Sequence, residues 1–125
     1  IGVYLQELHE YKTEPKIKIE TEKSESGASA GLMTSLQIYN LLNPTDITKG
    51  LTISGTGTID SEGNVGSIDG VKYKLAGAVK KHADVFISPE DNYKEAQQEK
   101  EKHNYKIKIL KVSTFDEALE KLNEL

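Results

Sequence analysis

Residues 51–88, LTISGTGTIDSEGNVGSIDGVKYKLAGAVKKHADVFIS, contain the clearest signals of secondary structure in the sequence. Residues 51–59 and 64–68 are rich in β-branched side chains and flank the polar stretch Asp60-Ser61-Glu62-Gly63. Polar and glycine turn residues between two extended segments are typical of a hairpin connection. The sequence therefore predicts a β-hairpin at the centre of the chain.

A helix and a strand are expected directly after this hairpin. Apolar residues in 71–82 recur at i, i+4, i+7 and i+8, which predicts a helix with one buried face, and the strand 84–88 ends at Pro89. The remaining C-terminal elements are expected to be a polar helix at 92–103, a strand at 105–112 and a helix at 115–125. Thr114 and Glu117 have capping-box spacing at the start of the last helix.

The segments before the hairpin complete the expected fold. Residues 1–8 and the alternating residues 16–22 are predicted to be strands. The apolar stretch 30–42 is too long for a typical strand and is closed by Asn43-Pro44, so it is predicted to be a largely buried helix. Early strands followed by alternating helices and strands indicate a mixed α/β (α+β) fold with a mixed sheet. The length is that of one ordinary domain, expected over residues 1–125.

Composition excludes several classes of protein. The 125 residues carry 16 Lys and Arg against 20 Asp and Glu, so no broad basic field favours nucleic acid. No run of about 18 apolar residues occurs, which excludes a membrane span inside this sequence. The lack of cysteine excludes disulfides and thiolate nucleophiles, and three widely separated histidines (His9, His82 and His103) form no local zinc signature. The sequence opens at Ile1 in strand-like residues, so we expect a mature product or an excised domain.

The sharpest chemical feature is residues 26–31, SGASAG, at the start of the expected helix 30–42. Small neighbours leave the Ser29 hydroxyl accessible, and the N–H groups and positive dipole end of a helix start can hold the oxyanion of a tetrahedral intermediate. The ordinary alternative for Ser29 is a helix N-cap. Residues 27–31 also fit G-x-S-x-G, but a nucleophile elbow needs a strand running straight into the serine, and several loop residues intervene here.

A serine without a histidine partner can be activated by a lysine, as in Ser-Lys dyads. Such a lysine must be neutral at working pH, whereas its ordinary pKa is ~10.4, so it needs apolar surroundings. Lys72 and Lys74 lie at the start of the expected helix 71–82, each roughly 80° from the middle of its apolar face on opposite sides. The periodicity does not choose between them, and the ordinary role of either is a snorkelling surface lysine.

His82 is expected near the centre of the same apolar face. A buried, hydrogen-bonded structural histidine is predicted there, because nothing nearby in sequence completes a triad. A small-molecule esterase, a third class of function, would need a histidine that no motif in this sequence positions.

Three blocks of sequence, taken together and in this order, resemble the proteolytic domain of the Lon family. They are residues 26–32, SGASAGL, residues 54–59, SGTGTI, and residues 66–74, GSIDGVKYK. Within that family, GTGTI and the continuation NYKEA at 92–96 are most similar to the membrane-anchored bacterial branch that carries a PDZ domain ahead of the protease. The resemblance implies the Lon proteolytic-domain fold and the activity of a serine endopeptidase.

Positions matched to the family's motifs imply the site residues. The family nucleophile falls on Ser29, and the second lysine of its Lys-x-Lys pair falls on Lys74. The hydroxyl residue that orients this lysine, usually Thr, is Ser54 here. Backbone N–H groups around Ala28 and Ser29 are the oxyanion candidates, and no cofactor or metal is implied.

The resemblance also implies partners and a location. The substrates would be peptides or unstructured protein segments, cut without ATP because no ATPase lies within these residues. The full-length protein would be membrane-anchored with a PDZ domain, its protease at the extracytoplasmic face of a bacterial cell membrane, and the fragment itself soluble. Lon relatives form rings, whereas an excised domain can stay monomeric, so both a homo-oligomer and a monomer remain open.

Two departures from the family pattern support an alternative function. Ala28 stands where the family usually has Pro, and Asp69 stands where it usually has the first Gly of a pair before the lysine helix. A carboxylate close to Lys74 would disfavour a neutral amine, although Asp69 is expected to point into solvent or to cap the helix. The alternative is a catalytically inactive peptide-binding or assembly module with the same fold.

Overall fold

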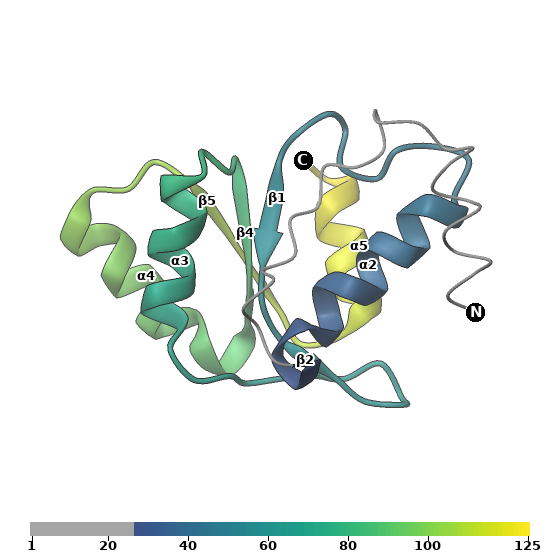
Figure 1. Cartoon of the computed structure of the whole chain (residues 1–125), viewed down its shortest axis with the longest axis horizontal. Helices are drawn as coiled ribbons and strands as arrows, with labels where there is room; N and C mark the ends of the chain where they lie inside the picture. The colour runs from purple at the N-terminus through teal and green to yellow at the C-terminus, as the bar shows by residue number, and fades with distance from the viewer. Residues whose placement is uncertain (1–26) are drawn as a thin grey trace.

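The computed structural model describes residues 27–125 (Figure 1). The helices and strands in this part of the chain are, in order, η2 (Gly27–Ala30), α2 (Gly31–Leu42), β1 (Ile53–Gly55), β2 (Thr58–Ile59), β3 (Val65–Gly66), α3 (Val71–Lys80), β4 (Val85–Pro89), α4 (Glu90–His103), β5 (Lys108–Val112) and α5 (Phe115–Asn123). The predicted mixed α/β fold is confirmed. The strands expected at 1–8 and 16–22 lie outside the described residues.

Three parallel strands form the central sheet in the order β1-β4-β5. All five residues of β4 are buried, as expected of a strand that has a neighbour on each side and helices on both faces. β2 and β3 pair separately as an antiparallel hairpin. The expected strand at 51–59 is therefore two strands, because Thr56 and Gly57 interrupt it and redirect the chain from the sheet into the hairpin.

The sheet separates two layers of helices, α2 and α5 on one face and α3 and α4 on the other (Figure 1). Alternation along the strands produces this division, since successive side chains point to opposite faces. The first core packs α2 and α5 on the sheet through Leu32, Met33, Leu36, Ile53, Val85, Ile87, Leu110, Val112, Ala118 and Leu122. The second packs α3 and α4 through Val71, Leu75, Ala78, Phe86, Ala96, Ile107 and Ile109.

The helix boundaries follow local chemistry. The Thr114 hydroxyl accepts the Glu117 N–H at 3.0 Å, which confirms the predicted cap of α5, while the Glu117 carboxylate accepts the N–H of Ser113 at 2.7 Å. α4 starts at Glu90, directly after Pro89, two residues earlier than expected, because proline suits the start of a helix. None of the helices among residues 27–125 is long and apolar enough to cross a membrane.

The prediction of a buried His82 is wrong. α3 ends at Lys80, and His82 lies in the following turn, exposed and with a φ of 62°. The helical periodicity that placed His82 on the apolar face does not extend beyond the last helical turn. His82 is therefore a turn residue and does not belong to the core.

Candidate active site

The segments that carry the candidate residues lie at one edge of the sheet, where the parallel strands β1 and β4 end. β1 leads into the hairpin, α3 runs back along the sheet, and β4 again runs parallel to β1. The first turn of α3 therefore lies at the carboxyl edge of the sheet, and Figure 1 shows the start of α2 at the same edge. In open α/β sheets this edge is where ligands bind.

Ser29 lies in the 3-10 turn η2, directly before α2, and is half-buried. Its carbonyl accepts two hydrogen bonds, from the Gly57 N–H at 3.1 Å and from the Thr56 hydroxyl at 3.2 Å. The Leu32 N–H donates in return to the Gly57 carbonyl at 3.0 Å. These bonds attach the turn that carries Ser29 to the chain immediately beyond β1.

The N-cap alternative for Ser29 is wrong, because the N-cap position of α2 is Ala30, which provides no side-chain cap. Ala28, the other candidate of this turn, is exposed within η2. The alanine that replaces the family's usual proline is thus still compatible with a regular helical turn at this point.

Gly55 allows this close packing at the end of β1. A Cβ on Gly55 would lie 2.7 Å from the Ile87 carbonyl oxygen and 2.9 Å from the Met33 Sδ. These distances are well inside van der Waals contact, and one of the atoms belongs to the backbone of the neighbouring strand. Only glycine fits between α2 and β4, so its place in the SGTGTI block has a packing reason.

Ser54 lies on β1 and faces the α3 and α4 layer. It pairs with Phe86 of β4, whose side chain belongs to the core between the sheet and those helices. Paired residues of neighbouring strands share a face, whereas the preceding residue, Ile53, contributes to the opposite core. Ser54 is thus on the face of the sheet that carries α3.

Lys74 lies in the first turn of α3, where its N–H donates to the Gly70 carbonyl at 3.2 Å. Its surroundings differ from those of Lys72: Lys74 is half-buried, whereas Lys72 is exposed. α3 packs against β1 as well as β4. Ser54 and the helix that carries Lys74 therefore share one side of the sheet, and the Ser29 turn is bonded to the residues that follow Ser54.

α3 begins with a left-handed residue. Gly70 occupies the N-cap position with a φ of 76° and makes no side-chain cap, and the adjacent Asp69 is exposed. The expectation that Asp69 caps α3 is wrong, whereas the expectation that it faces solvent is confirmed. Glycine is suited to this position because it adopts positive φ without steric cost.

Two further polar residues of this region were missed by the sequence analysis. Thr56 is fully buried and bonds the Ser29 carbonyl, and Asn92, 7% exposed, bonds the chain ahead of α3. Because residues 51–59 were expected to form one continuous strand, no separate role was predicted for Thr56. The only sequence signal for Asn92 was its presence in the NYKEA block.

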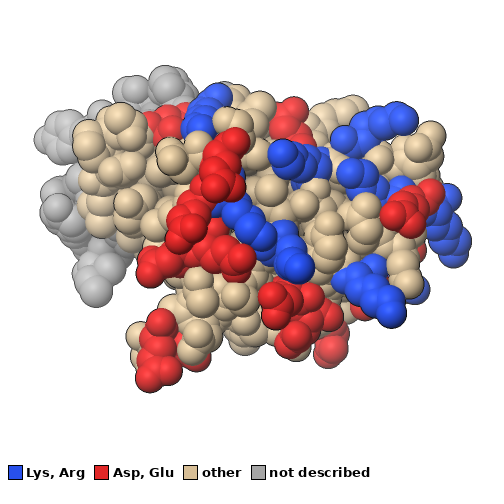
Figure 2. Space-filling view, turned by 180° about the vertical axis from the view of Figure 1, so that it is seen from behind, with Lys and Arg blue, Asp and Glu red and all other residues tan. Residues whose placement is uncertain are grey.

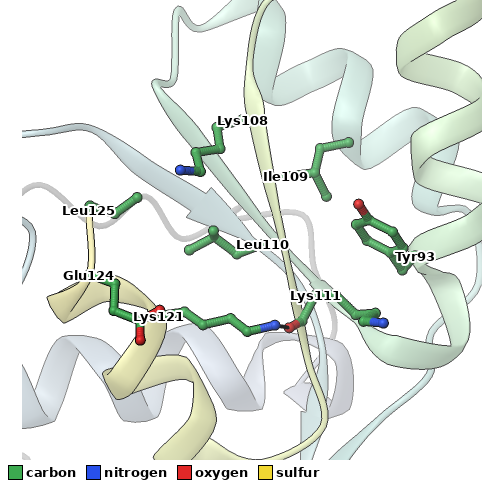
Figure 3. Close-up of a pocket in the computed structure, with 8 residues that line it drawn as sticks. All are labelled: Tyr93, Lys108, Ile109, Leu110, Lys111, Lys121, Glu124 and Leu125. Atoms are coloured by element: carbon green, nitrogen blue, oxygen red, sulfur yellow. Dashed lines mark hydrogen bonds between the residues drawn. The ribbon is translucent and has the colours of Figure 1, made fainter.

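Hollows occur both at this edge, beside the hairpin at Ile59 and Phe115, and away from it. A cavity of about 370 Å³ follows the outer side of β5 and is lined by Tyr93, Lys108, Ile109, Leu110, Lys111, Lys121, Glu124 and Leu125 (Figure 3). There the Lys121 amine donates to the Lys111 carbonyl, and the Lys111 amine lies 5.5 Å from the centre of the Tyr93 ring. The strand order is β1-β4-β5, so this cavity lies along the outer strand β5, separated by β4 from β1, the strand that carries Ser54.

The shifted carboxyl pKa values belong to structural turns. Hydrogen bonds from Ser113 hold the pKa of Glu117 below its ordinary value, and hydrogen bonds from Asn64 do the same for Asp60 in the hairpin turn. Burial raises the pKa of Asp46, but hydrogen bonds from Thr48 and Asn40 outweigh it and lower the net value.

Figure 2 shows acidic and lysine side chains intermixed over the rear face. Among residues 27–125, no three His, Asp or Glu side chains group as metal ligands.

The geometry defines a class: a mixed α/β domain with a serine turn and a lysine helix at the carboxyl edge of a parallel sheet. Residues 9–124 match the family described as the Lon protease (S16) C-terminal proteolytic domain. The match covers most of the chain, so this protein belongs to the Lon proteolytic-domain family, a family of serine peptidases.

Proposed function

We propose that this chain is a serine endopeptidase in which Ser29 and Lys74 form the catalytic dyad. The neutral Lys74 amine takes the Ser29 proton as the hydroxyl oxygen attacks the scissile carbonyl, and the resulting ammonium returns a proton to the leaving amine. Water then attacks the acyl-enzyme, with Lys74 again serving as base, which releases the acid and restores Ser29. Backbone N–H groups around Ala28 and Ser29 hold the oxyanion, and Ser54 orients the lysine.

One observation carries this proposal: the Ser29 turn is bonded to residues 56 and 57, directly after the strand whose Ser54 faces the helix of Lys74. Residues distant in sequence thus converge on one strand end. The half-buried state of Lys74, against the exposed state of Lys72, agrees with the requirement that the base be partly withdrawn from water.

The proposed substrate follows from the family of the domain. As a Lon-type proteolytic domain it cuts peptides or exposed, unstructured segments without ATP, held extended along a strand edge by backbone hydrogen bonds. The resemblance of GTGTI and NYKEA to the PDZ-containing branch supports a protease that works at the extracytoplasmic face of a bacterial membrane, anchored through other parts of a longer protein.

The test is a set of three substitutions assayed on an unstructured, fluorogenic peptide. Ser29→Ala and Lys74→Ala are each expected to lower kcat/KM by at least about 10³-fold, because each removes one half of the reacting pair. Lys72→Ala is the matched control and is expected to retain most of the activity. Equal losses for the two lysine variants would contradict the assignment of Lys74 as the base.

The alternative function is an inactive peptide-binding or assembly module, which Ala28 and Asp69 favour as departures from the family pattern. A serine-directed covalent inhibitor separates the two functions. An endopeptidase is expected to be labelled at Ser29, with labelling abolished by Ser29→Ala and strongly slowed by Lys74→Ala. Peptide binding without labelling or hydrolysis would favour the inactive module.

A further inference from the structure

A buried amide on α4 holds the chain just ahead of the lysine helix. The Asn92 Oδ1 accepts the Ile68 N–H at 2.9 Å, and the Asn92 Nδ2 donates to the Ile68 carbonyl at 3.0 Å. Both backbone groups of one residue are therefore satisfied by one side chain, which is itself 7% exposed. From this geometry we propose that Asn92 is a positioning residue for Lys74, an inference that rests on the proposed dyad.

Asn92 is a fixed point because of where it lies in the fold. It belongs to the first turn of α4, which follows directly from β4, the central strand with all five residues buried. Figure 1 shows the segment between the hairpin and α3 passing the start of α4. The amide thus ties this segment to the centre of the sheet.

The tie acts on Lys74 through a short path. Ile68 is two residues before Gly70, whose left-handed conformation starts α3, and the Gly70 carbonyl accepts the Lys74 N–H at 3.2 Å. A shift of Ile68 therefore moves Gly70 and the first turn of the helix. Every step between the Asn92 amide and the Lys74 backbone is either a covalent bond or a hydrogen bond.

The apolar contacts of α3 do not replace this tie. Val71, Leu75 and Ala78 press the helix onto the sheet, but burial of apolar surface is non-directional and sets the position along the helix axis poorly. The two hydrogen bonds to Ile68 have defined directions and lengths. A misplacement of about 1 Å in catalytic geometry can cost about 10²-fold in rate, so this anchor is expected to affect catalysis more than folding.

Asn40 provides a matched control. It is also a buried asparagine, 1% exposed, and its Oδ1 accepts the Ile47 N–H at 2.9 Å while its Nδ2 donates to Asp46. It lies near the end of α2, a helix whose first turn follows Ser29. Replacing Asn40 removes a similar buried amide from a segment that does not lead to Lys74.

The experiment compares Asn92→Ala with Asn40→Ala in melting temperature, peptide hydrolysis and hydrogen exchange. Similar losses of stability are expected, but only Asn92→Ala should lower kcat, by about 30-fold or more, with KM changed less than about threefold. It should also speed amide exchange of Ile68 and of the first turn of α3 by about tenfold or more. Asn92→Asp, which keeps the acceptor for the Ile68 N–H, is expected to retain more activity than Asn92→Ala.

The outcomes separate this inference from the proposed function. Equal kcat values for Asn92→Ala and Asn40→Ala, measured on folded protein, would overturn the positioning role. If Asn92→Ala fails to fold, Asn92→Asp decides, since a carboxylate is tolerated in the first turn of a helix; wild-type kcat and Ile68 exchange in that variant would overturn the role. If the unmodified protein shows no Ser29-dependent hydrolysis, the dyad is refuted, and unchanged Ile68 exchange in the variants would refute the anchor as well.

Discussion

The two halves of the candidate site are attached to the sheet by different means. On the serine side, the turn that carries Ser29 is held mainly by backbone hydrogen bonds. The Gly57 N–H donates to the Ser29 carbonyl, and the Leu32 N–H donates to the Gly57 carbonyl. The Thr56 hydroxyl adds a third bond, to the Ser29 carbonyl. On the lysine side, both hydrogen bonds to Ile68 come from a single side chain, Asn92.

The two halves are therefore sensitive to different kinds of substitution. Backbone hydrogen bonds persist through most substitutions, so the serine side is sensitive mainly to changes that push its segments apart. A side-chain anchor is removed by one substitution, so the lysine side depends on the identity of Asn92. Substitutions on the two sides are expected to separate these two kinds of sensitivity.

Gly55→Ala is expected to damage the serine side most. The added Cβ would meet the Ile87 carbonyl and the Met33 Sδ at under 3 Å, so the β1 end and α2 must separate. We expect the free energy of unfolding to fall by about 3 kcal/mol, the upper part of the range for overpacking. Urea denaturation measures this loss, and an unchanged midpoint would show that the serine side accommodates the methyl group.

Thr56→Val is expected to have a moderate effect on the same side. The substitution removes the hydroxyl donor to the Ser29 carbonyl but leaves the Gly57 N–H in place. The expected loss of stability is about 1 kcal/mol, typical of one hydrogen bond, with a fall in kcat smaller than that of Asn92→Ala. Thr56→Ser, which keeps the hydroxyl, is the control. A larger kcat loss for Thr56→Val than for Asn92→Ala would reverse the comparison.

Gly77→Ala is expected to strengthen the lysine side slightly. Gly77 lies inside α3, and a Cβ there would have no heavy atom within 4 Å. Alanine favours a helix interior over glycine by about 1 kcal/mol, so the melting temperature should rise. Because Asn92 and not helix propensity is proposed to position Lys74, kcat should stay within about twofold. A loss of activity in this more stable variant would argue against the proposal that Asn92, and not helix propensity, positions Lys74.

A fall in pH is not expected to break the hydrogen bonds of Asn92 to Ile68 or of Thr56 to Ser29 directly, since neither side chain carries a titratable group. The pKa of Glu117 is lowered from 4.5 by hydrogen bonds from Ser113, so its stabilising effect is present above pH 4.5 and is lost as the pH falls through the lowered value. Glu117→Gln should therefore lose less stability between about pH 5 and pH 3 than the unmodified protein. Identical urea midpoints for both proteins across that range would contradict this source of acid sensitivity.

The sequence predicted those parts of the fold that depend on local pattern. The helix 30–42 was expected one residue from its observed start at Gly31, because its apolar stretch is long and Asn43-Pro44 closes it. The cap of α5 at Thr114 followed from spacing alone. These features depend on neighbours in the chain, and local sequence is sufficient for them.

The parts that were missed depend on contacts distant in sequence. The break of the strand at Thr56 follows from the pairing of β1 with β4 and the bond to Ser29, 27 residues away. The Asn92 anchor joins residues 24 positions apart. Helical periodicity placed Lys72 and Lys74 at equal angles from the middle of the apolar face. It could not choose between them because it contains no information about β1, against which α3 packs. The roles of Ser29 and Lys74 remain predictions that the substitutions above test.

The bond from the Lys121 amine to the Lys111 carbonyl has a consequence for self-association. β5 ends the sheet formed by the described residues, and an outer strand with open backbone groups can recruit a strand from another molecule and start fibre growth. Here a strand that approached Lys111 would have to displace a charged amine and pass the exposed Lys108 and Lys111 side chains. The outer strand of the described sheet is thereby protected against pairing with a strand of another molecule.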